Sequence, residues 1–315
     1  MALIAVFALT ALFLIMLAGC TNETPTTDDK FAEGGKDILL DYNNVVLLDG
    51  NFNAWVIDVG QGDSILLEFP GKEFMLVDTG KPEAADAIWE VLEKKGATDL
   101  DFLVLTHPHA DHIGSVEALI EKGMQFDYLL ESDYPCDTQT CSLTEDAIAK
   151  VPHEKIDFKV GDKLKTNIPV IILNPSIKTY ASNTNDASIV LMVQHGQVRM
   201  LLMGDCEFDC EKNVMKDFSN LWANILKVGH HGSKTSSSKE FLNLIKPKSA
   251  VVSNALNNTF GHPAKETLDR LIDSGAVVYR TDTSGTVKIT SDGKNYTVLT
   301  DKSGWTIEIN NPSNN

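Results

Sequence analysis

Three histidines and an aspartate occur within six residues, directly after an apolar run. The run DFLVL ends at Leu105, and the segment THPHADH follows it. The apolar run predicts a buried strand, so His107 and His109 leave its end on the same side, because side chains two residues apart share a face. Asp111 and His112 lie in the next turn and can face a second position. Imidazoles and carboxylates in this order are typical metal ligands, and we expect this loop to hold two adjacent ions.

Four blocks of the sequence resemble the motifs of the metallo-β-lactamase superfamily. Besides the THPHADH segment they are Val77–Gly80 (VDTG), Met203–Asp205 (MGD) and Val228–Ser233 (VGHHGS). The order and spacing of the blocks match a single hydrolase domain over residues 51–310. The resemblance therefore implies an α/β fold, a four-layer αββα sandwich.

The resemblance also implies a ligand set for two divalent metal ions. It assigns His107 and His109 to one ion, Asp111 and His112 to the other, and Asp205 to both. The last ligand is either His230 or His231, because only one of two neighbours at a strand end points inward. We favour His230, which comes first after the strand, and expect His231 to be a proton donor or to face the substrate. The reverse order stays open.

The family usually supplies a third histidine to the first ion, and this sequence departs from that pattern. Asn183, Asn185 and Asp186 stand at that position, so we expect an oxygen ligand or water and a first site that can be partly occupied. His195 lies at the far end of a predicted hairpin. Roughly nine strand residues separate it from the end that carries Asp205, which is a distance of about 30 Å. His153 is a distant alternative. Histidines mixed with carboxylates suit Zn²⁺ or Mn²⁺.

Further residues are candidates for catalysis and for substrate binding. We expect Asp78 to hydrogen-bond the metal-binding loop and orient it, with a local turn role as the alternative. The catalytic candidates are then Asp78, Asp111 and His231. A hydroxyl-rich loop with interleaved lysines opens a predicted helix and offers a place for a phosphate, or else it is a solvated loop with helix caps. The substrate-binding candidates are Ser233, Lys234, Ser237 and His262.

A narrower resemblance concerns the hydrolase domain of the competence protein ComEC family. It rests on Asp58–Ser64 (DVGQGDS), on Ser236–Ser238 after the HHGS block, and on Phe260–Pro263 (FGHP). In that family the domain is attached to a DNA-uptake membrane channel and is thought to act as a nuclease. After the first twenty residues of this chain no apolar run is long enough to span a bilayer, so the resemblance is to the enzyme domain alone.

The N-terminus predicts attachment to a membrane. Met1–Gly19 is almost wholly apolar and ends in LAGC, which is similar to the lipobox of a prokaryotic lipoprotein signal peptide. Cys20 would then be lipidated, and residues 20–50 would form a flexible tether, because Thr21–Lys36 has too few apolar residues to fold. An uncleaved anchor is the alternative. Either way we expect an extracytoplasmic protein at a membrane surface.

Besides Cys20 the chain has four cysteines, an even number, and the expected extracytoplasmic location permits disulfides. Local pairing of Cys136 with Cys141 and of Cys206 with Cys210 is plausible. The alternative for Cys206, beside Asp205, is a soft metal ligand.

Charge bears on the substrate. The formal net charge of -17 repels polyanions, but residues 227–288 carry nine Lys or Arg against five Asp or Glu. We therefore expect a metal-dependent hydrolase, a phosphodiesterase or nuclease, whose substrate is a phosphodiester and can be DNA. The alternatives are a hydrolase of a small ester or lactone, such as a phosphocholine ester, and a non-catalytic surface partner that captures DNA. No obligatory protein partner is inferred.

Apolar runs and turn residues predict most of the elements around these motifs. The expected strands are 54–59, 64–69 and 74–77 as an antiparallel meander, 101–105, 170–173, the hairpin 189–194 and 198–203, 224–228, and a terminal meander within 287–309. The expected helices are 83–95, 112–122, and others after Asp205, from Ser238 and from Pro263.

Overall fold

The structure is a computed structural model that describes residues 31–32, 50–175, 183–302 and 307–309. The expected signal peptide 1–19, Cys20 and nearly all of the tether lie outside these residues. In the described part of the chain, no helix is both long enough and apolar enough to cross a membrane.

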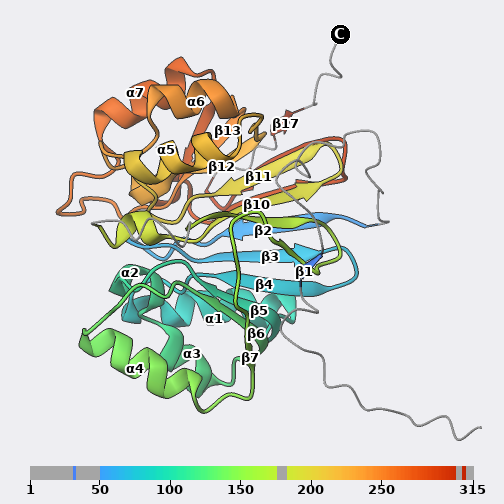
Figure 1. Ribbon diagram of the computed structural model, residues 1–315, viewed down its shortest axis with the longest axis vertical. Coiled ribbons are helices and arrows are strands. Elements are labelled where there is room, and N and C mark those ends of the chain that lie inside the picture. Colours follow the sequence, from blue (N-terminus) through green and yellow to red (C-terminus); the bar gives the residue numbers. More distant parts are fainter. Residues whose placement is uncertain (1–30, 33–49, 176–182, 303–306, 310–315) are drawn as a thin grey trace, which may run out of the picture.

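Short apolar runs with Gly-containing turns build one mixed sheet (Figure 1). The predicted meander is β2 (Phe52–Val56), β3 (Ile65–Phe69) and β4 (Glu73–Val77), paired antiparallel. After α1 (Ala85–Lys95) the chain returns as β5 (Asp99–Leu105), which pairs with β4 in parallel. The sheet continues with β6 (Gln125–Glu131) and β7 (Glu154–Lys155) beyond β5, and with β15 (Val287–Ser291), β16 (Tyr296–Thr300) and β17 (Ile307–Ile309) beyond β2.

The second sheet begins antiparallel and becomes parallel. β10 (Val190–His195) and β11 (Val198–Leu202) form the predicted hairpin, with Gly196 in its turn. From β11 onward the strands alternate with helices and pair in parallel, as expected of strands that are buried on both faces. The order is β1 (Phe31–Ala32), β8 (Lys163–Leu164), β9 (Val170–Asn174), β10, β11, β12 (Ile225–Lys227), β13 (Ser249–Val252) and β14 (Val277–Arg280).

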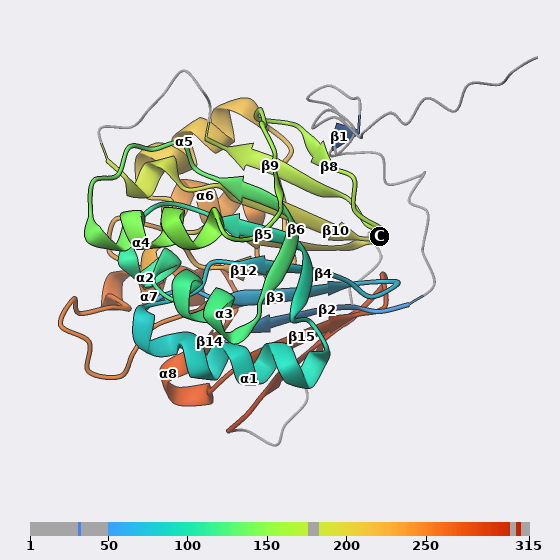
Figure 2. The same cartoon turned by 90° about the horizontal axis from the view of Figure 1, so that it is seen from below.

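The two sheets face each other and helices cover the outer face of each (Figure 1 and Figure 2). The first sheet is covered by α1, α2 (Ala110–Ile113), α3 (Val116–Lys122) and α4 (Gln139–Ile148), the second by α5 (Phe208–Asp217), α6 (Lys239–Ile245) and α7 (Lys265–Asp273), while α8 (Thr281–Ser284) follows β14. Between the sheets, fully buried side chains such as Leu67, Val104 and Leu191 form one apolar cluster. The predicted αββα sandwich is therefore confirmed.

Local sequence explains the end of α1 and the start of α6. α1 stops at Gly96, whose φ of 67° is left-handed, and α6 starts after Ser238, whose hydroxyl accepts a hydrogen bond from the Phe241 amide at 3.2 Å. The single helix predicted over 112–122 is wrong, because the chain divides at Gly114. A Cβ there would lie 2.6 Å from Cδ of Pro82, so this close approach requires glycine. The residues of α2 are thus held in a separate short turn.

Several elements were not predicted, among them α4, β6, β13 and β14. β13 and β14 have four residues each, too few for a periodic pattern to separate from a loop. Both disulfides are confirmed: Cys136 pairs with Cys141 and Cys206 with Cys210. The alternative of Cys206 as a metal ligand is therefore wrong.

Candidate metal centre

Four strands end at one edge of the sandwich, where the two sheets face each other. β4 ends just before Asp78, β5 before the THPHADH segment, β11 before Asp205, and β12 before the two histidines at 230 and 231. In α/β folds, ligands bind beyond the carboxyl ends of the parallel strands. Residues that are more than a hundred positions apart in the sequence therefore meet here.

The THPHADH segment is held by hydrogen bonds from its neighbours. Asp78 accepts from the Thr106 amide at 2.8 Å and from the Thr106 hydroxyl at 2.7 Å, and its Oδ2 lies 2.7 Å from Nδ1 of His112. That bond turns Nε2 of His112 toward the centre. Asp78 thus makes the loop-orienting contacts expected of it, and it does so from a left-handed backbone conformation, with φ 60°. A strained conformation that its surroundings impose is common at functional sites.

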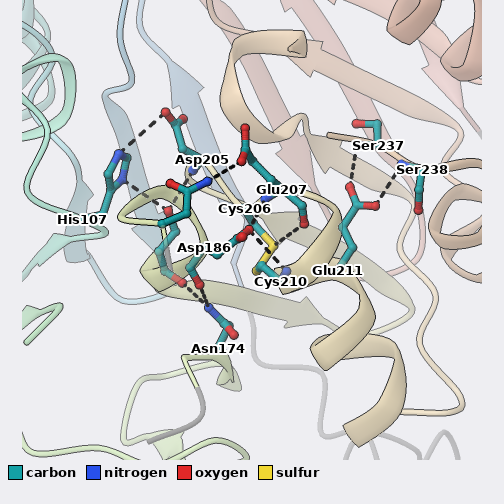
Figure 3. Close-up of a disulfide and its surroundings, with 12 residues drawn as sticks. His107, Asn174, Asp186, Asp205, Cys206, Glu207, Cys210, Glu211, Ser237 and Ser238 are labelled. Atoms are coloured by element: carbon teal, nitrogen blue, oxygen red, sulfur yellow. Dashed lines mark hydrogen bonds and ion pairs between the residues drawn. A yellow bond between two sulfur atoms is a disulfide. The ribbon is translucent and has the colours of Figure 1, made fainter. Parts of the chain in front are cut away.

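Asp205 lies in the middle of the centre. Its carboxylate is 3.1 Å from Nε2 of His112, 3.5 Å from Nε2 of His231 and 3.7 Å from Nε2 of His107; the contact with His107 is drawn in Figure 3. Nε2 of His107 is also 3.0 Å from Nδ1 of His109. The structure therefore brings together all five residues for which the resemblance implied ligand roles, since Asp111 joins them through His231.

His231, and not His230 as we expected, points into the centre. The His231 ring is buried, with Nε2 3.4 Å from Asp111, and its Nδ1 bonds the Ser253 carbonyl at 3.0 Å. His230 is 23% exposed, bonds Glu207 at 2.8 Å through Nδ1, and reaches Asp205 only at 3.8 Å. The reason is backbone geometry: β12 has ended by Lys227, and both histidines are left-handed, with φ 47° and 51°. Strand alternation, on which the preference for His230 rested, does not apply there.

Small groups of these side chains fit divalent cations. One group is His107, His112 and Asp205, and another is Asp111, His112 and His231; in each, ligand atoms lie within 4.8 Å of one another. Three of these buried atoms lack a well-oriented hydrogen bond, namely Nε2 of His112, Oδ1 of Asp205 and Nε2 of His231, although the first two lie 3.1 Å apart. Buried polar atoms without partners are costly, and a metal ion would satisfy all three.

The electrostatics of the centre also favour a cation. Burial opposes a charge on His231, yet Asp205, Asp111 and Asp63 around it raise its pKa to about 10. Burial opposes a charge on His112 too, and Asp205 and Asp78 still raise its pKa well above the ordinary value. A proton and a metal ion compete for the same imidazole lone pair. Carboxylates that attract protons so strongly also attract metal ions.

The position of the missing third histidine is occupied by a polar cluster. Asp186 accepts hydrogen bonds from the amides of Glu207 and Cys210, at 2.9 and 3.3 Å, so its carboxylate caps α5. Asn183 bonds the Glu207 carboxylate, and the Asn185 amide nitrogen lies 3.4 Å from Nδ1 of His230. Figure 3 shows Asp186 and Glu207 close to the Cys206–Cys210 disulfide.

The hydroxyl-rich loop is used largely for its own structure. The Ser237 and Ser238 amides both donate to the Glu211 carboxylate (Figure 3), so a protein carboxylate already occupies the place expected for a phosphate. Ser233 and Ser237 are buried, and the Ser233 hydroxyl bonds Thr235 at 2.9 Å. The expectation that Ser233 and Ser237 contact the substrate therefore needs correction, because their polar groups are turned inward. Lys234 is exposed.

His262 lies beside His230 and Phe260. Its ring is 5.3 Å from the His230 ring and 5.9 Å from the Phe260 ring. Burial and the neighbouring His230 and His231 lower the pKa of His262 to about 4. The other two histidines considered are elsewhere: Nδ1 of His195 bonds Ser291 at 3.1 Å, and Nδ1 of His153 lies 2.8 Å from the Val151 carbonyl.

Two residues that lie at the centre, Lys227 and Asp63, were not identified from the sequence. Lys227 and Asp63 are both fully buried and form an ion pair at 2.7 Å, and Oδ1 of Asp63 lies 3.5 Å from Nδ1 of His231. The signal was present, since a lysine inside the apolar run NILKV must find a partner when buried. Asp63 belongs to the DVGQGDS block, to which no role was given.

A cavity of about 390 Å³ adjoins His107 and Pro108. Its wall is formed by residues 131–136 and by α4, which the Cys136–Cys141 disulfide joins. The centre therefore has open space next to one of its predicted ligands.

Comparison with known proteins agrees with this geometry. Residues 57–124 match the family described as the metallo-beta-lactamase superfamily. The chain is similar to ComE operon protein 3 of Bacillus subtilis (strain 168), with 32% identity over 252 residues, 74% of this chain and 32% of that protein. It is similar to competence protein ComA of Neisseria gonorrhoeae, with 31% identity over 235 residues, 74% of this chain and 31% of that protein. The chain thus spans about a third of the length of these relatives.

Solved structures support the fold. The metallo-beta-lactamase fold protein YhfI from Bacillus subtilis superposes with a TM-score of 0.51 at 13% identity, over 76% of this chain and 100% of that one. At that identity the likeness concerns the fold alone. The predicted resemblance to the metallo-β-lactamase superfamily and to competence proteins is confirmed.

Proposed function

Because this chain has the metallo-β-lactamase fold and resembles competence proteins over 74% of its length, we propose that it is a metal-dependent phosphodiesterase that cleaves nucleic acid. The observation that carries the proposal is the buried group of His107, His112, Asp205 and His231, in which Nε2 of His112, Oδ1 of Asp205 and Nε2 of His231 lack well-oriented hydrogen bonds. A divalent cation would satisfy these buried atoms. A metal-dependent hydrolase is the class of enzyme that uses it.

The residues divide between two ion positions. His107 and His109 would hold the first ion, Asp111, His112 and His231 the second, and Asp205 would contact both. When bound, two divalent ions supply a water of lowered pKa and stabilise both the attacking and the leaving oxygen of an in-line displacement. The mixed nitrogen and oxygen ligands suit Zn²⁺ or Mn²⁺. Without a third histidine, the first position is the one that we propose to be partly occupied.

Side chains around the ions have distinct tasks. Asp78 holds Nδ1 of His112 and the Thr106 amide, which fixes the loop in place. Nδ1 of His231 donates to the Ser253 carbonyl, so Nε2 is the nitrogen that a metal ion would take after displacing its proton. His230 is partly exposed and held by Glu207, and we propose that it contacts the substrate, together with His262 and Lys234.

The same proposal covers location and partners. We propose that lipidated Cys20 attaches the enzyme to the outer side of a membrane, where a flexible tether lets it reach DNA.

The test is hydrolysis by the purified full-length protein after it is loaded with Mn²⁺ or Zn²⁺. We expect cleavage of single-stranded DNA and of bis-p-nitrophenyl phosphate, and a loss of several orders of magnitude in Asp205→Asn, because the substitution removes the charge that offsets both ions. The matched control is Asp101→Asn, which alters an aspartate near the opposite end of β5 that bonds the Phe74 amide. Hydrolysis of a phosphocholine ester or a lactone, with no action on DNA, would replace the proposal with a small-substrate hydrolase.

A further inference from the structure

An exposed aromatic side chain stands at the rim of the metal centre. Phe260 is 61% exposed, and its ring lies against the His262 ring. It belongs to the FGHP block, in which only His262 has a proposed role. An exposed ring beside a catalytic centre is a candidate for ligand contact.

Rings connect Phe260 to the centre in a continuous series. The Phe260 and His262 rings stack with centroids 5.9 Å apart and an interplanar angle of 21°. The His262 ring meets the His230 ring edge to face at 5.3 Å, and Nε2 of His230 is 3.8 Å from Asp205. The series therefore leads from a proposed metal ligand, Asp205, to the exposed Phe260 ring.

The loop that carries Phe260 is built to hold it outward. The Asn258 side-chain oxygen accepts hydrogen bonds from the Phe260 amide at 3.1 Å and from the His262 amide at 3.0 Å. The Asn258 side-chain nitrogen donates to the Ala255 carbonyl at 2.9 Å and to the His262 carbonyl. One side chain thus ties both ends of the loop, so the exposure of the ring is a fixed feature of the fold.

A cation from the other half of the sandwich lies over the same ring. Nζ of Lys81 is 5.9 Å from the Phe260 ring centroid. Lys81 follows the Val77–Gly80 block that orients the metal-binding loop, and the Ser115 hydroxyl bonds its carbonyl. A lysine and an aromatic ring, contributed by the two halves of the domain, therefore lie together near the proposed metal centre.

We infer that Phe260 and His262 form a stacking platform for an unpaired nucleobase of the substrate, with Lys81 beside the adjoining phosphate. Stacking on aromatic side chains is how proteins hold single-stranded nucleic acid without reading its sequence, since every base has a flat π-face. In a duplex the bases are stacked inside and cannot reach the ring. The inference rests on the proposed phosphodiesterase function and deepens it, because it specifies single-stranded DNA or RNA as the substrate class.

The test compares binding of two labelled oligonucleotides by fluorescence anisotropy, in the Asp205→Asn background so that no strand is cut. One is a short single strand, and the other has the same backbone with abasic residues throughout. We expect the base-bearing strand to bind more tightly, and Phe260→Leu to weaken its binding about 5- to 150-fold, as for the loss of one base–aromatic stack. Phe260→Trp should retain the affinity, and the abasic strand should be indifferent to either change.

Ile272→Ala is the matched control, since Ile272 is 62% exposed and lies on α7. Equal affinity of Phe260→Leu and the parent protein for the base-bearing strand would overturn the inference, and so would a Phe260→Leu loss of equal size on both strands. Cleavage by the protein with its Asp205 intact is measured separately. If single strands are cleaved but Phe260→Leu does not change binding, the proposed function is supported and the stacking platform is wrong. If no phosphodiester is hydrolysed at all, the proposed function itself is wrong.

Discussion

Replacing His231 and His230 in turn by alanine separates the ligand from its neighbour. His231 points Nε2 at Asp111 and Asp205, at 3.4 and 3.5 Å, from a fully enclosed position. His230 reaches Asp205 only at 3.8 Å and is engaged by Glu207. We expect His231→Ala to lose metal affinity at the second position, and His230→Ala to keep both ions while it turns over substrate more slowly.

The size of the loss follows from the number of ligands. A structural zinc site with four ligands is worth about 10–16 kcal/mol, or roughly 3 kcal/mol per ligand. At about 1.4 kcal/mol for each factor of ten, losing one ligand raises the dissociation constant of one ion by about a hundredfold. His230→Ala removes only a longer contact near the rim, and its dissociation constants should stay within about threefold of the parent.

The assay titrates each metal-free protein with Zn²⁺ in competition with a chromophoric chelator, and elemental analysis gives the number of ions retained. Thermal unfolding of both variants in EDTA checks that the folds are equally intact. Metal loss confined to His230→Ala would refute the reasoning from ring orientation and restore the sequence-based assignment. Loss of affinity in neither variant would remove the last histidine from the ligand set.

Three further outcomes are expected. Carboxylates raise the pKa of His231 to about 10 and that of His112 well above its ordinary value, so metal binding at pH 7 should displace protons and metal affinity should rise with pH. Calorimetry in buffers of different ionisation enthalpy should detect the released protons. Identical heats of binding in all buffers would contradict this. Lys227→Met leaves the buried Asp63 carboxylate unpaired and should lower the free energy of unfolding by about 3–5 kcal/mol. The double variant Asp63→Asn/Lys227→Met should recover part of that loss. Urea denaturation measures both variants, and an unchanged midpoint in Lys227→Met would be inconsistent with a stabilising ion pair. Cys20→Ser should move the protein from the membrane to the soluble fraction, and unchanged fractionation with an uncleaved N-terminus would replace the lipid anchor with an apolar one.

Much of the fold could be read from local patterns. The short runs that became β2, β3 and β4, and the hairpin of β10 with β11, are apolar stretches bounded by turn residues, and their pairing needs only chain neighbours. The strand before His107 was predicted for the same reason, because it is also an apolar stretch that ends in polar residues. Strand β13 and helix α4 were missed, because neither a four-residue run nor a polar helix has a strong period of its own.

The side-chain directions at the centre required the tertiary structure. Residue identity and spacing were enough to nominate His107 and Asp111, because ligand chemistry is a property of the side chains and their order along the chain, whereas Asp205 came from the family resemblance. Which of His230 and His231 turns inward depends on two left-handed residues beyond the end of β12, a conformation imposed by packing rather than by strand alternation. The burial of Lys227 against Asp63, and the use of Glu211 to hold the Ser237 and Ser238 amides, are contacts between segments far apart in the chain. Periodicity describes neighbours along the sequence, and the partner across the sandwich is known only once both sheets are packed.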